Sequence, residues 1–198
     1  VKLQEQLGLP VNRNVPVIGL VSRLVSAKGL DLITRIMDEL LSQEDCQFVL
    51  LGTGDKPYED WFRDLQWRHS QKVSANIRFS NELAQRIYAG SDIFLMPSEY
   101  EPCGLGQLIA LRYGTIPVVR ETGGLKDTVQ PFNKYTNEGN GYSFANINAH
   151  ELLFALKKAI GDYSDQRLWY QLVANAMASD YSWGSAAKQY IDLYNSVL

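Results

Sequence analysis

Cysteine and histidine are scarce in this sequence, which has 198 residues and two of each. The two cysteines, Cys46 and Cys103, are too few for a disulfide framework or a zinc cluster in a chain of this length, which favours a cytoplasmic location. The histidines, His69 and His150, stand apart and lack the i, i+4 spacing of a metal-binding pair. We therefore expect no metal site.

The sequence also lacks long apolar runs and a strong excess of one charge. No stretch approaches the roughly 20 apolar residues of a membrane span, and residues 1–7 are amphipathic rather than signal-like. A formal net charge of -3 argues against a nucleic-acid or anionic-membrane surface. We therefore expect the partner to be a small molecule. The length and the hydrophobic fraction of 45% fit one globular domain.

Apolar runs alternate with segments of helical spacing over the first two thirds of the chain. We expect strands at 17–21, 46–51, 77–79, 93–96 and 116–119, and helices at 28–41, 58–67, 82–88 and 104–113. Continuous apolar strands are buried on both faces, and their alternation with helices requires crossover connections. The pattern predicts an α/β domain with a doubly wound parallel sheet, followed by a polar loop at 130–141 and three helices at 150–160, 166–177 and 183–197.

The segment 101–105, Glu-Pro-Cys-Gly-Leu, lies between an expected strand and an expected helix, where ligands bind in open α/β sheets. Pro102 falls where the first helical turn is expected, and Gly104 allows close approach of a ligand to the backbone. Glu101 has two interpretations. It is either a carboxylate stabilised at a helix N-terminus or a group that binds a sugar hydroxyl and a developing positive charge.

Three other turns follow expected strands and could bind phosphate. Arg23 and Lys28 offer a planar fork and a point charge to a diphosphate, although they could equally form a solvated basic turn. Residues 52–54, Gly-Thr-Gly, are either a tight turn or a ligand contact, and Pro57 occupies the place of the third glycine in a dinucleotide fingerprint. Residues 122–124, Thr-Gly-Gly, are either an anion-binding concavity or an ordinary loop.

Aromatic side chains and the remaining carboxylates near these turns have simpler interpretations. Phe79 either stacks on a nucleobase or packs in the core. Glu99 and Asp92 are expected to be exposed loop charges. The four tryptophans lie on expected helices and are assigned to packing: Trp61, Trp67, Trp169 and Trp183.

Several segments spread over nearly the whole chain match a known family in order and separation. They are Ser-Arg-Leu-Val-Ser-Ala-Lys-Gly at 22–29, Gly-Thr-Gly at 52–54, Ala-Gly-Ser-Asp at 89–92, Pro-Ser-Glu-Tyr-Glu-Pro-Cys-Gly-Leu at 97–105, Leu-Arg-Tyr-Gly-Thr at 111–115 and Arg-Glu-Thr-Gly-Gly-Leu-Lys-Asp-Thr-Val at 120–129. In these features the chain resembles the bacterial glycogen synthases and plant starch synthases, which are retaining glucosyltransferases of the two-domain GT-B architecture.

The resemblance implies that residues 1–198 are the C-terminal, Rossmann-like domain that binds the nucleotide-sugar donor. The N-terminal acceptor domain of the family has no counterpart in these residues, so we expect the isolated domain to be inactive. The last expected helix resembles one that packs back towards that domain in the family.

Site residues also follow from the resemblance. It implies that Arg23 and Lys28 contact the donor pyrophosphate and that Glu101 lines the glucose pocket. These three are the implied catalytic residues. Phe79 is implied to lie against the base. The remaining donor-binding residues that it implies are Gly52, Gly54, Cys103, Gly104, Leu105, Thr122, Gly123 and Gly124.

The implied reaction transfers glucose from ADP-glucose to the non-reducing end of an α-1,4-glucan with retention, and releases ADP without a metal or cofactor. One departure matters, because broader GT-B retaining enzymes carry a second glutamate that would fall at Ile109. No residue here distinguishes adenine from uracil by itself. The alternatives are a UDP-glucose-dependent GT-B transferase and a non-catalytic nucleotide-binding module.

Overall fold

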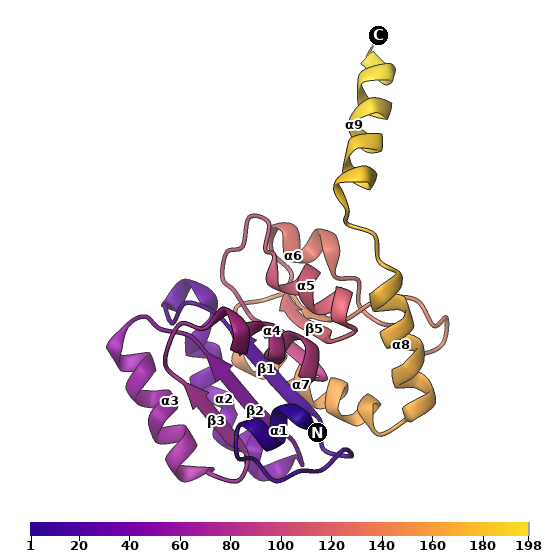
Figure 1. The fold of residues 1–198 in the computed structure, drawn as a ribbon. Helices are drawn as coiled ribbons and strands as arrows, with labels where there is room; N and C mark the ends of the chain where they lie inside the picture. Colours follow the sequence, from indigo (N-terminus) through magenta and orange to yellow (C-terminus); the bar gives the residue numbers. More distant parts are fainter. Residues whose placement is uncertain (198) are drawn as a thin grey trace.

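The computed structural model describes residues 1–197 and is built around one six-stranded parallel sheet between layers of helices (Figure 1). The strands are β1 (Val17–Val21), β2 (Gln47–Leu51), β3 (Val73–Asn76), β4 (Ile93–Met96), β5 (Ile116–Arg120) and β6 (Tyr142–Phe144). Their order is β3-β2-β1-β4-β5-β6, and every neighbouring pair is parallel. The order reverses between β1 and β4, which creates a crevice at the carboxyl ends of these two strands.

The helices connect the strands and close the chain. They are α1 (Lys2–Gln6), the short 3-10 turn η1 (Ser26–Lys28), α2 (Leu30–Gln43), α3 (Lys56–Arg68), α4 (Asn81–Gly90), α5 (Gly106–Tyr113), α6 (Gly123–Thr128), α7 (Ala149–Tyr163), α8 (Gln166–Ala178) and α9 (Trp183–Val197). Within the described residues no helix is both long and apolar enough to cross a membrane.

The two faces of the sheet are covered by different helices. On one face α2 packs against α3 and α7, and their apolar side chains bury Ile18, Leu20 and Phe48 of the sheet. On the other face α1, α4 and α5 are neighbours, and Leu83 and Ile87 of α4 pack against alternate positions of β1 and β2. Because both faces are buried, the central strands are continuous apolar runs rather than alternating ones. The doubly wound α/β class predicted from that pattern is confirmed.

Two expected elements begin or lie elsewhere in the structure, and one strand was missed. The third strand was expected at 77–79 but lies at Val73–Asn76, where Val73 pairs with Phe48 of β2. The helix expected from residue 104 begins at Gly106, because Gly104 adopts a left-handed φ of 75° that a helix does not accommodate. The strand β6 was not expected at all, because three residues among Asn and Gly carry too little periodicity to mark a strand.

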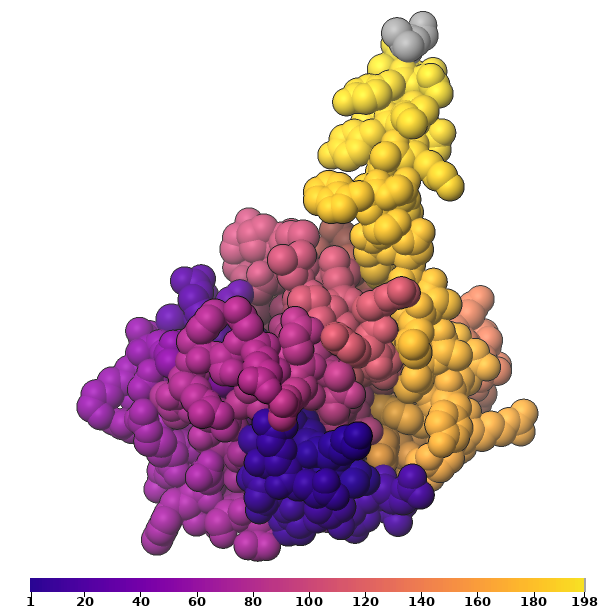
Figure 2. Space-filling view, in the orientation of Figure 1, coloured from indigo at the N-terminus to yellow at the C-terminus, as the bar shows by residue number. Residues whose placement is uncertain are grey.

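The tryptophans divide into two groups, so the assignment of all four to packing is partly wrong. Trp169 is buried in an edge-to-face contact with Tyr163, and Trp61 packs on the core against Phe62. Trp67 and Trp183 are 79% and 91% exposed, so neither ring is part of the core. Trp183 opens α9, a helix that stands clear of the body of the molecule (Figures 1 and 2).

Candidate functional site

A cavity of about 250 Å³ opens at the carboxyl edge of the sheet, where the strand order reverses between β1 and β4. The ends of both strands form its floor, and the loops that follow them form its walls. The structure brings these residues expected at the site into the lining: Arg23, Lys28, Glu101, Gly104 and Leu105. Two cations and one carboxylate from segments far apart in the sequence therefore face one small space.

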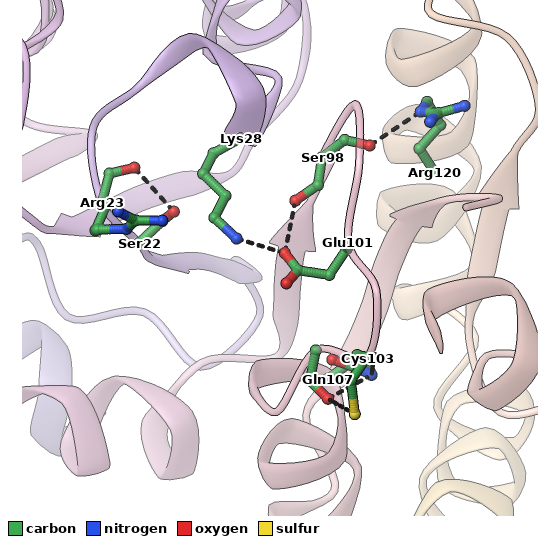
Figure 3. Close-up of polar contacts among 9 residues, drawn as sticks. Ser22, Arg23, Lys28, Ser98, Glu101, Cys103, Gln107 and Arg120 are labelled. Atoms are coloured by element: carbon green, nitrogen blue, oxygen red, sulfur yellow. Dashed lines mark hydrogen bonds and ion pairs between the residues drawn. The ribbon is translucent and has the colours of Figure 1, made fainter. Parts of the chain in front are cut away.

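Lys28 and Glu101 form an ion pair inside this cavity (Figure 3). Lys28 Nζ donates to Glu101 Oε2 at 2.5 Å, and the two side chains are 23% and 12% exposed. Ser98 Oγ donates to the same carboxylate oxygen at 3.2 Å. The Lys28 ammonium has three N–H donors, and Glu101 takes one of them. Both hydrogen bonds reach Glu101 Oε2, and within the described residues Glu101 Oε1 accepts none. Both groups thus retain bonding capacity for a ligand.

Glu101 does not lie at a helix N-terminus, so that interpretation of its carboxylate is wrong. Residues 101–105 form an irregular loop ahead of α5, and Pro102 is not in a first helical turn. The loop holds its shape through a fully buried side chain that the sequence analysis missed. Gln107 Nε2 donates to the carbonyls of Cys103 and Gly104, at 3.0 and 3.1 Å. A polar residue at an inward-facing position of an amphipathic helix is the signal that marks it.

A second cavity, of about 380 Å³, adjoins the first and is more apolar in its lining. It lies between the loops after β2 and β3, and Arg23 lines both cavities. Phe79 lines it and is 82% exposed, so its alternative assignment to the core is wrong. Gly52 lines the same space, as does Ile109, the position at which broader GT-B retaining enzymes are expected to carry a second glutamate.

The turn at 122–124 packs against the back of the Glu101 loop rather than into either cavity. Gly124 N–H donates to the carbonyls of Glu101 and Pro102, at 3.2 and 3.1 Å. Leu125 N–H donates to Thr122 O at 3.0 Å as α6 begins. The twin glycines and the Glu101 loop are therefore in direct contact, and the Gly124 amide is already engaged.

Two further residues expected at the site lie beside the cavities without lining them. Gly54 forms a parallel β-bridge with Leu24. No side chain fits at this position, because a Cβ would lie 2.3 Å from Leu24 O. Cys103 is exposed on the rim of the Glu101 loop.

Asp92, expected as an exposed loop charge, is instead largely buried at the opposite, amino edge of the sheet. Its Oδ2 accepts the Val17 N–H at 2.8 Å. Burial raises the pKa of this carboxyl to about 6, against the partial opposition of that hydrogen bond.

No group of three or more His, Cys, Asp or Glu side chains converges with metal-binding geometry in the part of the chain that the structure describes. His69 instead lies 2.8 Å from Asp38 at the surface. The chemistry available at the carboxyl edge is that of two cations, one carboxylate and an exposed aromatic ring. This set suits a phosphorylated sugar attached to a planar base.

Comparison with known proteins identifies the family of the chain. A family model described as glycosyl transferases group 1 matches residues 4–173. The chain is 55% identical to a glycogen synthase of Clostridium novyi (strain NT) over 197 residues, which is 100% of the chain and 41% of that protein. It is 57% identical to a glycogen synthase of Desulforamulus reducens over 196 residues, which is 99% of the chain and 41% of that protein.

A solved structure extends this similarity to three dimensions. The catalytic domain of starch synthase IV from Arabidopsis thaliana, bound to ADP and acarbose, matches with a TM-score of 0.87 and 37% identity, covering 98% of the chain and 41% of that structure. The chain thus spans about two fifths of the length of these relatives. The predicted resemblance to glycogen and starch synthases is confirmed, and the chain belongs to the group 1 glycosyl transferases.

Proposed function

We propose that this chain is the donor-binding domain of a retaining glucosyltransferase that extends an α-1,4-glucan from its non-reducing end. The donor is ADP-glucose, and the remaining length of the relatives supplies the acceptor domain. The observation that carries the proposal is the pair of adjoining cavities with Arg23 lining both, one containing Lys28 and Glu101 and the other containing Phe79. ADP as the nucleotide is supported by its presence in the starch synthase structure.

In this proposal the diphosphate lies between the two cavities, against Arg23 and Lys28. The Arg23 guanidinium offers a planar fork of donors, and the Lys28 ammonium has donors left beyond the one it gives to Glu101. As the bond to glucose breaks, negative charge grows on the departing diphosphate. Fixed cations in a partly enclosed site stabilise that charge more than water would.

Glu101 is assigned to the glucose side of the same bond. Its Oε2 is held by Lys28 and Ser98, which leaves Oε1 to accept a hydrogen bond from a sugar hydroxyl. A carboxylate in this place also favours the positive charge that develops on the sugar ring in an oxocarbenium-like transition state. Phe79 is assigned to the base, because an exposed ring at the mouth of an apolar cavity offers a face for stacking.

The binding half of the proposal is tested by titration calorimetry of the chain with ADP and with UDP. We expect ADP to bind more tightly, and Arg23→Ala and Lys28→Ala each to weaken it by about 10- to 100-fold, since a hydrogen bond to a charged group contributes about 1.5–3 kcal/mol. The matched control is Arg86→Ala, whose guanidinium bonds Gln6 and Glu82 outside both cavities. Preference for UDP would favour the UDP-glucose transferase instead.

The catalytic half is tested in a protein with the full length of the relatives, supplied with ADP-glucose and a maltooligosaccharide. We expect glucose transfer that falls by orders of magnitude in Arg23→Ala or Lys28→Ala. Nucleotide binding without transfer by the unaltered full-length protein would identify the non-catalytic module. Near-normal turnover in both variants would remove these cations from the mechanism.

A further inference from the structure

Arg120, the last residue of β5, binds three backbone carbonyls from two different loops. Its Nε donates to Ser98 O at 2.9 Å, its Nη2 donates to Glu99 O, and its Nη1 donates to Ala145 O at 3.3 Å. The first two carbonyls belong to the loop after β4, which carries Glu101, and the third follows β6. The guanidinium is half-buried and lines neither cavity of the candidate site.

Ser98 connects Arg120 to the ion pair of the site. This buried serine accepts Arg120 on its carbonyl and donates from its hydroxyl to Glu101 Oε2, so one residue lies between the guanidinium and the carboxylate (Figure 3). The next residue is held from the opposite side, because Glu99 N–H donates to Ala27 O at 3.0 Å. Ala27 is the chain neighbour of Lys28, so this backbone segment contacts Glu101 directly and is tied to Lys28 through the adjoining residue.

We infer that Arg120 is a positioning residue that fixes the Glu101 carboxylate between Lys28 and the donor sugar. An irregular loop has no ladder of hydrogen bonds to hold it, and its two carbonyls at 98 and 99 face the arginine instead. A planar fork with donors in several directions serves three carbonyls at once, which a lysine ammonium on a flexible stem does less well. The inference rests on the function proposed above and adds a residue that touches no substrate.

A purely structural role for Arg120 would make a different prediction. In that case its loss would lower stability without a selective effect on the chemical step. Lys72 provides the matched control, because its Nζ also donates to two backbone carbonyls, those of Leu41 and Glu44, each at 2.8 Å. These bonds lie at the end of α2, away from both cavities.

The kinetic test compares Arg120→Ala, Arg120→Lys and Lys72→Ala in a protein with the full length of the relatives. We expect Arg120→Ala to lower kcat about 100-fold with little change in the KM for ADP-glucose, because a misplaced carboxylate affects the transition state more than donor binding. Arg120→Lys should recover part of kcat, and Lys72→Ala should leave it unchanged. A loss confined to KM, or an equal loss of kcat in Lys72→Ala, overturns the inference.

Combination with Glu101→Ala asks whether Arg120 acts through that carboxylate. If it does, Arg120→Ala should lower kcat far less in the Glu101→Ala background than in the unaltered protein. The same factor in both backgrounds overturns the inference. Should Arg120→Ala fail to fold, Arg120→Lys and Arg120→Gln in the same two backgrounds give the comparison.

A measurement without turnover separates this inference from the proposed function. Amide hydrogen exchange of the present chain should be about 10-fold faster at Glu99 in Arg120→Ala and unchanged there in Lys72→Ala, since bonds to a charged group hold that segment closed. Unchanged exchange at Glu99 overturns the inference whatever the kinetics. Absence of transfer by the unaltered full-length protein, with the exchange effect present, would refute the proposed function and leave the loop contact in place.

Discussion

At the amino edge of the sheet, the buried carboxyl of Asp92 makes stability depend on pH in a definite direction. Its pKa rises from 3.8 to about 6 because burial disfavours the charged form. Below pH 3.8 the group is protonated whether the protein is folded or unfolded, so burial imposes no penalty there. Between pH 3.8 and about 6 the unfolded chain loses this proton while the folded protein keeps it, so stability falls as the pH rises. Above about pH 6 the loss is complete and reaches up to ~3 kcal/mol for a shift of about two units.

Asp92→Asn tests this sign, because the amide keeps an oxygen for the Val17 N–H and carries no charge. Between pH 4 and pH 7 we expect the free energy of unfolding of the variant to rise relative to that of the unaltered protein. Urea unfolding at a series of pH values measures the difference. Parallel stability curves for the two proteins over this range would contradict the raised pKa.

The two cysteines differ enough to report on the candidate site separately. Cys46 is fully buried, and burial raises its pKa to about 12, so its thiol is inert at neutral pH. Cys103 is exposed on the loop that carries Glu101. Labelling with a thiol reagent should therefore modify one fast thiol per chain, and none in Cys103→Ser. Saturating ADP-glucose should slow that reaction, whereas an unchanged rate would mean that the donor does not cover this loop.

The sequence indicates the polar residues of the site better than it indicates their neighbours. Arg23, Lys28 and Glu101 follow strands whose apolar runs are unambiguous, so their common edge is predictable from topology alone. Arg120 could not be assigned, because its function depends on which carbonyls it meets, and these come from residues 98, 99 and 145. Asp92 looked exposed because nothing local shows that a strand end is covered.

At the scale of elements, the same division holds between long apolar segments and short ones. The run 93–96 is strand β4 without any change of boundary, and the helices α7, α8 and α9 lie within a few residues of their expected positions. The strand β6 and the helix α6 are too short to show a period. Pairing with β5 decides the structure of β6, and packing of Leu125 against Val119 of β5 holds α6. The shape of the loop before α5 could not be predicted from the sequence either, because it depends on the hydrogen bonds that the Gln107 side chain donates to the carbonyls of Cys103 and Gly104.

The loops after β1 and β2 depend on each other through close backbone contact at Gly54. A Cβ there would lie 2.3 Å from Leu24 O and 2.6 Å from its carbonyl carbon, and backbone cannot move aside as a flexible side chain can. We expect Gly54→Ala to destabilise the protein by about 1–3 kcal/mol and to weaken ADP binding, because the loop that it displaces also carries Arg23.

Gly161 supplies the control for that substitution. It lies inside α7, and a Cβ at this position would meet no atom within 4 Å. Gly161→Ala should therefore stabilise the protein by about 0.5–1 kcal/mol through helix propensity, with ADP affinity unchanged. Urea unfolding and calorimetry measure both effects. A Gly54→Ala protein as stable as the unaltered one would show that the two loops are not in the contact described.

At the scale of the whole molecule, the chain combines a packed α/β body with a helix that contributes nothing to its core. No residue of α9 is buried in the described part of the chain, and the helix projects away from the sheet and its covering helices (Figures 1 and 2). Its exposed apolar side chains include Trp183, Tyr190, Ile191, Leu193, Tyr194 and Val197. A helix of this length without tertiary contacts is only marginally stable in water.

Removal of residues 183–198 tests how far the body is independent of this helix. We expect the shortened chain to have the same urea midpoint and the same affinity for ADP, because both cavities and the buried core lie within residues 1–182. The control removes the buried ring of Trp169 by Trp169→Ala, which should cost about 3–5 kcal/mol. A lower midpoint for the shortened chain would mean that α9 packs on the body in solution, in an arrangement different from that of Figure 1.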